Sequence, residues 1–188
     1  MTKVMGIDCS SKTIGWSVLD INGTSITFID AGYIKPPKDG TLFERLSQAK
    51  KEFTEIFKKY NPDQLALEDL IQFMSGASGA KTIIMLTQFN RMIGLTAFEL
   101  LKDNPHLYSV MTIRHGLKFD KVLPKKDEIP ELVAKHLKIN FPYEYKKRKN
   151  KTGVASVMEE SYDKADAVAV ALYHCLKISN QLKSKTKK

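Results

Sequence analysis

Four acidic residues occupy positions where a packed core would not ordinarily place a charge. Asp8 ends the first apolar run of the chain, Glu68 ends another short apolar run, and Asp163 and Asp166 open the last helical pattern. Carboxylates grouped at the ends of strands repel one another and are costly to bury without a counter-charge. Their oxygens are hard ligands of the kind that Mg²⁺ or Mn²⁺ prefers. The four acids are therefore the candidate catalytic residues and the candidate metal ligands.

Such a cluster could hydrolyse phosphodiesters if it held two ions. A pair of ions about 3.5–4 Å apart can activate a water, stabilise charge on a scissile phosphate and assist the leaving oxygen. Structural alternatives exist, since Asp163 and Asp166 could complement a helix dipole and Asp8 could cap a turn. We prefer the catalytic interpretation because all four acids occur at the ends of predicted elements.

The hydrophobic pattern predicts the strands and helices that carry these acids. Runs rich in β-branched and aromatic residues predict strands, and apolar residues at helical spacing predict helices. Pro130 is expected near the first turn of its helix, where its missing N–H costs nothing. In chain order the prediction is strands at 4–8, 13–19 and 25–34, a helix at 42–60, a strand at 65–67, a helix at 80–101, a strand at 107–113 and helices at 124–137 and 162–182.

This order predicts an α/β fold, with a mixed five-stranded sheet and helices on both of its faces. The first and fourth strands are expected to be neighbours, so that Asp8 and Glu68 face one another. Asp163 and Asp166 are three residues apart and share one face of a helix. We expect a single domain over residues 1–182 and a flexible basic tail over 183–188.

The composition favours a nucleic-acid partner and argues against other classes. The chain has 30 Lys and Arg against 21 Asp and Glu, a net charge of +9 that would attract a phosphate backbone. Its only cysteines, Cys9 and Cys175, are too far apart to form a paired zinc-binding motif, which favours a reducing compartment. The longest apolar stretch, 82–101, contains charged residues that would be costly in lipid. We expect a cytoplasmic protein, in a bacterium or a phage-infected cell, without a membrane partner.

A run of basic residues precedes the last acidic pair. The segment 145–151 has no aliphatic residue, which predicts a mobile, exposed loop, and it contains Lys146, Lys147, Arg148, Lys149 and Lys151. Contact with DNA phosphates is the functional interpretation, and a solvated loop is the alternative. His115 receives no assigned role.

Three motifs resemble the RuvC family of Holliday-junction resolvases, and in detail its phage-encoded members. The first comprises residues 6–10 (GIDCS) followed by 13–16 (TIGW), the second is Leu67-Glu68, and the third is 162–171 (YDKADAVAVA). They occur in the family's order along nearly the whole chain.

The resemblance implies a ribonuclease H-like fold and a metal-dependent homodimer that cuts symmetric strands of a four-way junction. It implies that Asp8, Glu68, Asp163 and Asp166 hold two Mg²⁺ ions, with Mn²⁺ able to substitute. It also implies that Phe73, an aromatic residue after the second acid, stacks on an unpaired base, although a phenylalanine in a loop is often a core anchor. By the same analogy the helix at 80–101 forms the dimer interface, the alternative being an ordinary buried helix.

Two rival functions stay open at this point. One is a nuclease of the same fold that acts on forks, flaps or RNA. The other is a non-catalytic nucleic-acid-binding module whose acids are structural. Metal-dependent nicking of a four-way junction, compared with other substrates, would separate the three.

Overall fold

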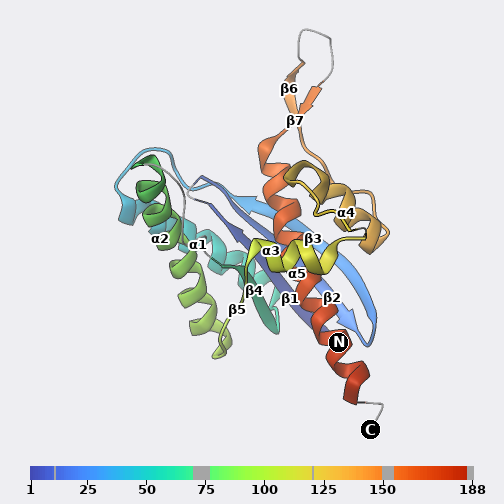
Figure 1. Ribbon diagram of the computed structural model, residues 1–188. Helices are drawn as coiled ribbons and strands as arrows, with labels where there is room; N and C mark the ends of the chain where they lie inside the picture. The colour runs from blue at the N-terminus through green and yellow to red at the C-terminus, as the bar shows by residue number, and fades with distance from the viewer. Residues whose placement is uncertain (11, 70–76, 120, 150–154, 186–188) are drawn as a thin grey trace.

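A five-stranded sheet forms the centre of the molecule, with strand order β3-β2-β1-β4-β5 (Figure 1). The computed structural model describes residues 1–10, 12–69, 77–119, 121–149 and 155–185, with backbone alone at 77–79, 81, 147–149, 155 and 180–185. The strands are β1 (Thr2–Cys9), β2 (Ile14–Asn22), β3 (Ser25–Ile34), β4 (Gln64–Glu68) and β5 (His106–Tyr108). β1, β2 and β3 pair antiparallel, whereas β4 is parallel to both β1 and β5. The predicted mixed sheet and its β1–β4 neighbours are confirmed.

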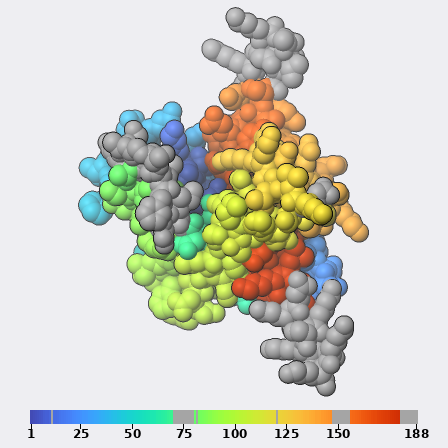
Figure 2. Space-filling view, viewed as in Figure 1, coloured from blue at the N-terminus to red at the C-terminus, as the bar shows by residue number. Residues whose placement is uncertain are grey.

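Helices cover both faces of the sheet, as the sequence predicted. The helices are α1 (Leu42–Tyr60), α2 (Ala77–Leu101), α3 (Val110–Leu117), α4 (Ile129–Leu137) and α5 (Glu159–Lys185), with a 3-10 turn η1 (Lys126–Glu128) before α4. α1 and α2 lie on one face, and α3, α4 and α5 on the other (Figure 1). The segment of α3 and α4, yellow in Figure 2, covers part of α5.

Each face has its own apolar core. Met5 and Ile7 of β1 point towards α1 and α2, where they meet Phe53 and Phe89. Val4 of the same strand points to the other face and packs with Val168 and its neighbours on α5. This alternation along β1 explains why the strand reads as a continuous apolar run, because both of its faces are buried. Asp8 follows at the end of that run.

Helix boundaries follow local capping signals. α1 begins after Thr41, whose side chain accepts from Glu44 N while Glu44 accepts from Thr41 N, and it ends at Asn61 in the left-handed region. The predicted bounds of 42–60 are confirmed. α4 begins with Pro130 in its first turn, also as predicted.

The predicted strand at 107–113 is wrong after its second residue. Ser109 caps a helix, because its side chain accepts from Thr112 N, and α3 follows. Residues 110–113 have high β propensity, but Ile113 and Leu117 lie four apart and bury one helical face in the core. Tertiary burial therefore overrides the local preference.

The predicted mobile loop at 145–151 is also wrong over its first five residues. β6 (Tyr145–Lys149) pairs antiparallel with β7 (Ala155–Val157) and forms a two-stranded ribbon that projects from the domain (Figure 1). A ribbon of two strands leaves long side chains solvated on both faces, so a charged strand is tolerated there. Lys151 lies outside the described residues.

The last helix begins earlier than predicted. α5 starts at Glu159 instead of residue 162, so Asp163 and Asp166 lie beyond its first turn. The helix dipole acts mainly within the first turn, which weakens the structural interpretation of these two acids. α5 also continues to Lys185, into the predicted tail, and residues 186–188 lie outside the described part of the chain.

Candidate active site

Three of the four predicted acids come together at the end of β1. Carboxylate oxygens of Asp8, Asp163 and Asp166 all lie within 4.8 Å of one another. Asp8 comes from the sheet, and the two other acids come from one face of α5. The spacing of three residues on a helix and the strand-end position of Asp8 thus bring groups 155 or more residues apart into one cluster, which we call the acid cluster.

Close packing of α5 on the sheet makes this approach possible. A Cβ added to Gly15 of β2 would lie 2.1 Å from Asp163 O, and one added to Gly6 would lie 2.3 Å from Ala167 O. Only glycine lets the helix backbone come this near to the strands. The buried Ser17 Oγ donates to Ala167 O at 2.9 Å and ties the same turn of α5 to β2.

Glu68 lies beside the acid cluster rather than inside the 4.8 Å group. It ends β4, whose Leu67 pairs with Ile7 next to Asp8. The buried Asn90 of α2 donates from Nδ2 to Glu68 O at 2.8 Å and so fixes the end of this strand. The charge of Glu68 interacts with the acid cluster, since Glu68 raises the pKa of Asp8 and Asp166 raises the pKa of Glu68.

Burial and mutual repulsion hold the acids in a costly state. Burial, followed by repulsion from Glu68, Asp166 and Asp163, raises the pKa of Asp8 well above its ordinary value. Burial is also the main cause that raises the pKa of Glu68 to about 7 and that of Asp166 to about 6. Burial raises the pKa of Asp163 as well. Four carboxylates that resist ionisation at one place are typical of a functional site.

Two cations partly offset this repulsion, and sequence reasoning missed both. Lys126 Nζ lies 3.3 Å from Asp163 Oδ1 and 3.6 Å from Asp166 Oδ2. Burial alone would lower the pKa of Lys126, but Asp166, Asp163 and Asp8 raise it. Arg114 of α3 lowers the pKa of Glu68 and of Asp166 through its charge. No local pattern distinguishes these two from the other basic residues of the chain.

The donor set fits a hard divalent cation. Every side chain of the acid cluster offers carboxylate oxygen, and the cluster contains neither His nor Cys, which favours Mg²⁺ or Mn²⁺ over Zn²⁺. A bound cation would also relieve the repulsion that raises these pKa values. The ammonium group of Lys126 compensates for only part of the negative charge of these carboxylates.

The remaining predicted site residues divide between described and undescribed positions. Lys146 is exposed on β6, and its charge acts on Glu160 at the start of α5, so the base of the ribbon lies near the site. Lys147, Arg148 and Lys149 lie on the same strand, with only their backbone described. Phe73 and Lys151 lie outside the described residues. His115 is exposed.

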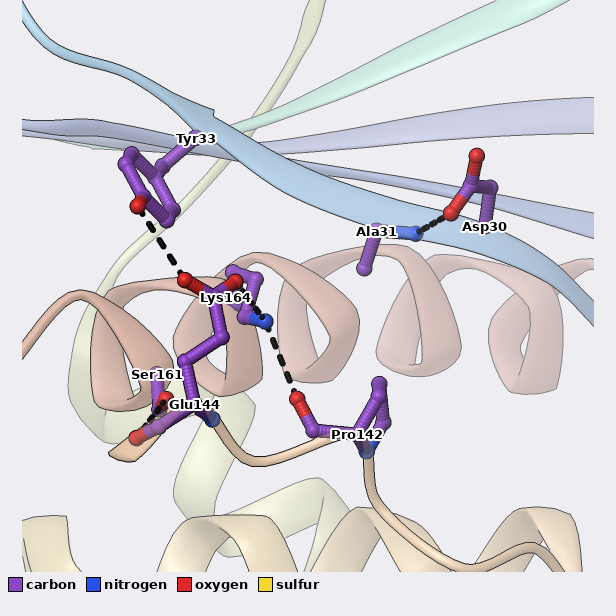
Figure 3. Close-up of polar contacts among 7 residues, drawn as sticks. All are labelled: Asp30, Ala31, Tyr33, Pro142, Glu144, Ser161 and Lys164. Atoms are coloured by element: carbon purple, nitrogen blue, oxygen red, sulfur yellow. Dashed lines mark hydrogen bonds and ion pairs between the residues drawn. The ribbon is translucent and has the colours of Figure 1, made fainter. Parts of the chain in front are cut away.

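A buried lysine anchors the base of this ribbon (Figure 3). Lys164 Nζ donates to Pro142 O at 2.9 Å and to Glu144 Oε1 at 2.7 Å. Glu144 Oε2 accepts from Tyr33 of β3 at 3.1 Å, and Ser161 Oγ accepts from Glu144 N at 2.9 Å. We call these contacts the anchor network. It joins β3, the segment before β6 and α5 within one residue of Asp163.

Comparison with known families decides what kind of protein carries this site. The sequence profile described as "Crossover junction endodeoxyribonuclease RuvC" matches residues 4–143, about three quarters of the chain. The chain belongs to the RuvC family. Proteins described as crossover junction endodeoxyribonuclease RuvC are 26% identical over 181 residues in Fusobacterium nucleatum and 28% identical over 172 residues in Campylobacter curvus. The first alignment covers 96% of this chain and 83% of its relative, and the second covers 92% and 95%.

Solved structures of Holliday junction resolvases have the same fold. Thermus thermophilus RuvC in complex with a Holliday junction substrate superposes with a TM-score of 0.69 at 16% identity, covering 95% of each chain. A yeast mitochondrial Holliday junction resolvase gives 0.63 at 15% identity, covering 96% of this chain and 80% of the resolvase. The resemblance to the RuvC family and its fold is confirmed.

The RuvC family model covers two of the four acids. Asp8 and Glu68 lie within the matched residues 4–143, whereas Asp163, Asp166 and the β6–β7 ribbon follow them. Among the helices that the structure describes, none is long and apolar enough to cross a membrane.

Proposed function

We propose that this RuvC-family chain resolves Holliday junctions and related branched DNA by metal-dependent phosphodiester hydrolysis. The observation that carries the proposal is the convergence of Asp8, Asp163 and Asp166 oxygens within 4.8 Å, with Glu68 beside them. These four acids would hold two Mg²⁺ ions, or Mn²⁺ in their place. The bound ions would supply Lewis-acid stabilisation of the phosphate and a water of lowered pKa.

The protein's own residues would prepare this chemistry. Glu68 and Asp8 would contribute carboxylates from two parallel strands, and α5 would contribute the other two from one rigid helix. Lys126 would lie beside the reacting phosphate, where its ammonium group can offset negative charge. Rigid elements hold such groups more accurately than loops do, which favours a site built on strands and a helix.

We propose further that the enzyme acts as a homodimer through α2, in the cytoplasm of a bacterium or of a phage-infected cell. One face of α2 packs on the sheet through the buried Phe89, Ile93 and Ala97. Its other side leaves Ile84 60% exposed and Leu95 58% exposed, more apolar surface than a solvated helix needs.

Basic residues of the ribbon would bind the DNA backbone. Lys146 is exposed, and Lys147, Arg148 and Lys149 share its strand, with Lys151 close in sequence. If all five contact phosphates, they contribute about −4 to −5 to the log–log salt slope of binding. Stacking of Phe73 on a base stays a prediction.

A cleavage assay on a synthetic immobile four-way junction in Mg²⁺, mapped at nucleotide resolution, tests the function. Two symmetric nicks are expected, with weaker cutting of forks, flaps, linear duplexes and RNA–DNA hybrids. Equal cutting of all substrates would favour a less selective nuclease, and no nicking in Mg²⁺ or Mn²⁺ would favour a non-catalytic binding module.

Asp8→Asn tests the acid cluster. We expect junction binding to survive and cleavage in Mg²⁺ to disappear, because the amide removes one anionic ligand while keeping the shape of the side chain. Glu55→Gln, an exposed acid on α1, is the matched control and should cleave normally. Cleavage by Asp8→Asn at the wild-type rate would remove Asp8 from the mechanism.

Leu95→Glu tests the dimer. The substitution places a charge at the exposed apolar side of α2, so light scattering should show a monomer where the wild type gives a dimer. Glu99→Gln, on the same helix, is the control for a change in charge. A monomeric wild type would contradict the dimer and leave the nuclease assignment in place.

A further inference from the structure

A wide pocket opens beside the acid cluster. It has a volume of about 1100 Å³, and Lys126 and Asp163 line it together with residues of the β1–β2 connection, the β3–α1 connection and α1. The acid cluster therefore lies at the margin of a space that can hold more than one phosphate. We call this space the flanking pocket.

The flanking pocket is lined by charges of both signs, which are grouped by segment. Lys12, from the β1–β2 connection, and Lys35, Lys38 and Arg45, from the end of β3 to α1, form a basic wall. The part of the lining that η1 and the start of α5 contribute, which we call the acidic wall, carries the carboxylates of Asp127, Glu159 and Glu160 together with Lys126. A polyanion that enters would lie along the basic wall, because the acidic wall repels it.

Two cations of the basic wall are committed to the protein itself. Lys35 forms an ion pair with Glu160, which bridges the two walls. Arg45 Nε donates to Pro37 O at 2.8 Å, and its guanidinium lies 5.5 Å from the centre of the Phe89 ring. These contacts hold the wall in place.

The other two cations are available. Lys12 and Lys38 are exposed, and neither side chain makes a hydrogen bond or an ion pair with the described residues. Lysine ammonium groups that are hydrated and unpaired can contact phosphate without first breaking a protein contact. Both therefore suit an anionic ligand that lies in the pocket.

We propose that the flanking pocket binds the phosphodiester backbone of the strand being cut, next to the scissile phosphate, with Lys12 and Lys38 contacting one or two flanking phosphates. The inference rests on the proposed nuclease function, and it assigns a substrate contact apart from the metal-binding acids and apart from the β6–β7 ribbon. The ligand is a phosphodiester because the pocket continues directly from the place where a phosphate would react.

The test combines a protein variant with a chemical change in the DNA. The variant is Lys12→Ala with Lys38→Ala, and the matched control is Lys51→Ala with Lys58→Ala, two exposed lysines of α1 outside the pocket. All are made in the Asp8→Asn background, so that binding is measured by fluorescence anisotropy without cleavage. The DNA is a four-way junction in which single phosphates around the cut are replaced, one at a time, by uncharged methylphosphonates.

We expect the pocket variant to bind about five- to twentyfold more weakly at 0.1 M salt and to lower the log–log salt slope by about 1 to 2. At one or two phosphates adjacent to the cut, the methylphosphonate should weaken DNA binding by the protein that keeps Lys12 and Lys38. The same methylphosphonate should cause little further loss of binding in the pocket variant. Such non-additivity is the signature of a direct contact.

Additive losses at every phosphate, or a loss no larger than that of the control pair, would overturn the proposal. The outcome is separable from the nuclease assignment. Absence of any nicking by the wild-type protein would reject the proposed function, whereas normal nicking with additive losses would reject only the flanking pocket.

Discussion

Asp163 and Lys164 are adjacent on α5, yet their surroundings differ in every respect that matters for function. The Asp163 side chain is 16% exposed and faces two more carboxylates, with Lys126 3.3 Å away as a partial counter-charge. The Lys164 side chain is 4% exposed and donates to Pro142 O and to Glu144 Oε1. Asp163 repels the neighbouring carboxylates, and this repulsion is only partly compensated. Lys164 carries a buried charge whose hydrogen-bond partners are all supplied by the protein.

The same helix therefore serves two purposes. Repulsion within the acid cluster stores free energy that a bound cation can release, whereas the anchor network leaves nothing for a ligand to supply. Asp163 of the acid cluster and Lys164 of the anchor network lie on the same turn of α5. The anchor network therefore also fixes the orientation of the helix that carries Asp163 and Asp166. Removing a charged side chain should therefore raise the stability of the metal-free protein in the acid cluster and lower stability in the anchor network.

Removing one acid should have the largest effect, lowering activity without lowering stability. We expect Asp166→Asn to lower the rate of junction cleavage in Mg²⁺ by about 10³-fold or more, since one anionic ligand is lost. The metal-free protein should become more stable, because one repelling charge is removed. Single-turnover cleavage and thermal unfolding in EDTA measure the two effects, and a loss of stability in EDTA would contradict the view that the cluster is strained.

Breaking the anchor network should do the reverse. We expect Lys164→Met to lower the free energy of unfolding by about 2 kcal/mol, and Glu144→Leu by about 3 kcal/mol. Glu144 is the more costly partner to remove, because its loss leaves the buried Lys164 without its ion pair. Loss of Lys164 costs less, because the Glu144 side chain is 42% exposed and can be hydrated. Denaturant unfolding gives both values, with Lys51→Met as an exposed control. The reverse order of the two losses would contradict this account.

The two regions should also respond to pH with opposite signs. The pKa of Glu68 is raised to about 7 and that of Asp166 to about 6, mainly by burial. Between about pH 4 and pH 7 the folded state thus binds more protons at these groups than the unfolded state does, and their contribution to stability falls as pH rises. We expect a loss on the order of 2 kcal/mol across this window in EDTA, which Mg²⁺ restores at pH 8.

In the anchor network the hydrogen bond from Lys164 lowers the pKa of Glu144. Its stabilising contribution is present above the ordinary glutamate pKa and is lost as pH falls through the lowered value. Subtracting the stability curve of Glu144→Gln from that of the wild type isolates this term. Equal slopes for both proteins in acid would count against it.

Tyr33→Phe should have the smallest effect. It removes only the hydrogen bond at 3.1 Å from the Tyr33 hydroxyl to Glu144, and Lys164 keeps its own contacts. A loss of about 0.5–1 kcal/mol in unfolding free energy is expected, with cleavage unchanged. A marked loss of cleavage would mean that this end of the anchor network acts on the acid cluster.

Much of the fold could be predicted because its signals are local. The bounds of α1 and β3 follow from alternation and helical spacing, and the place of Pro130 follows from the chemistry of a first turn. The errors have tertiary causes. At α3 the burial of Ile113 and Leu117 overrides β propensity, and at β6 strand pairing orders a segment that composition alone assigns to a loop.

The four candidate acids could be singled out from the sequence, because carboxylates at the ends of apolar runs stand out in the local pattern. The long-range partners of acidic side chains, by contrast, became visible in the folded chain and not in the sequence. Lys126 reaches Asp163 across 37 residues of sequence, and Tyr33 reaches Glu144 across 111. Nothing in the local pattern around either residue marks such a contact, since the direction of a side chain is set by the packing of distant elements and not by its neighbours in the chain.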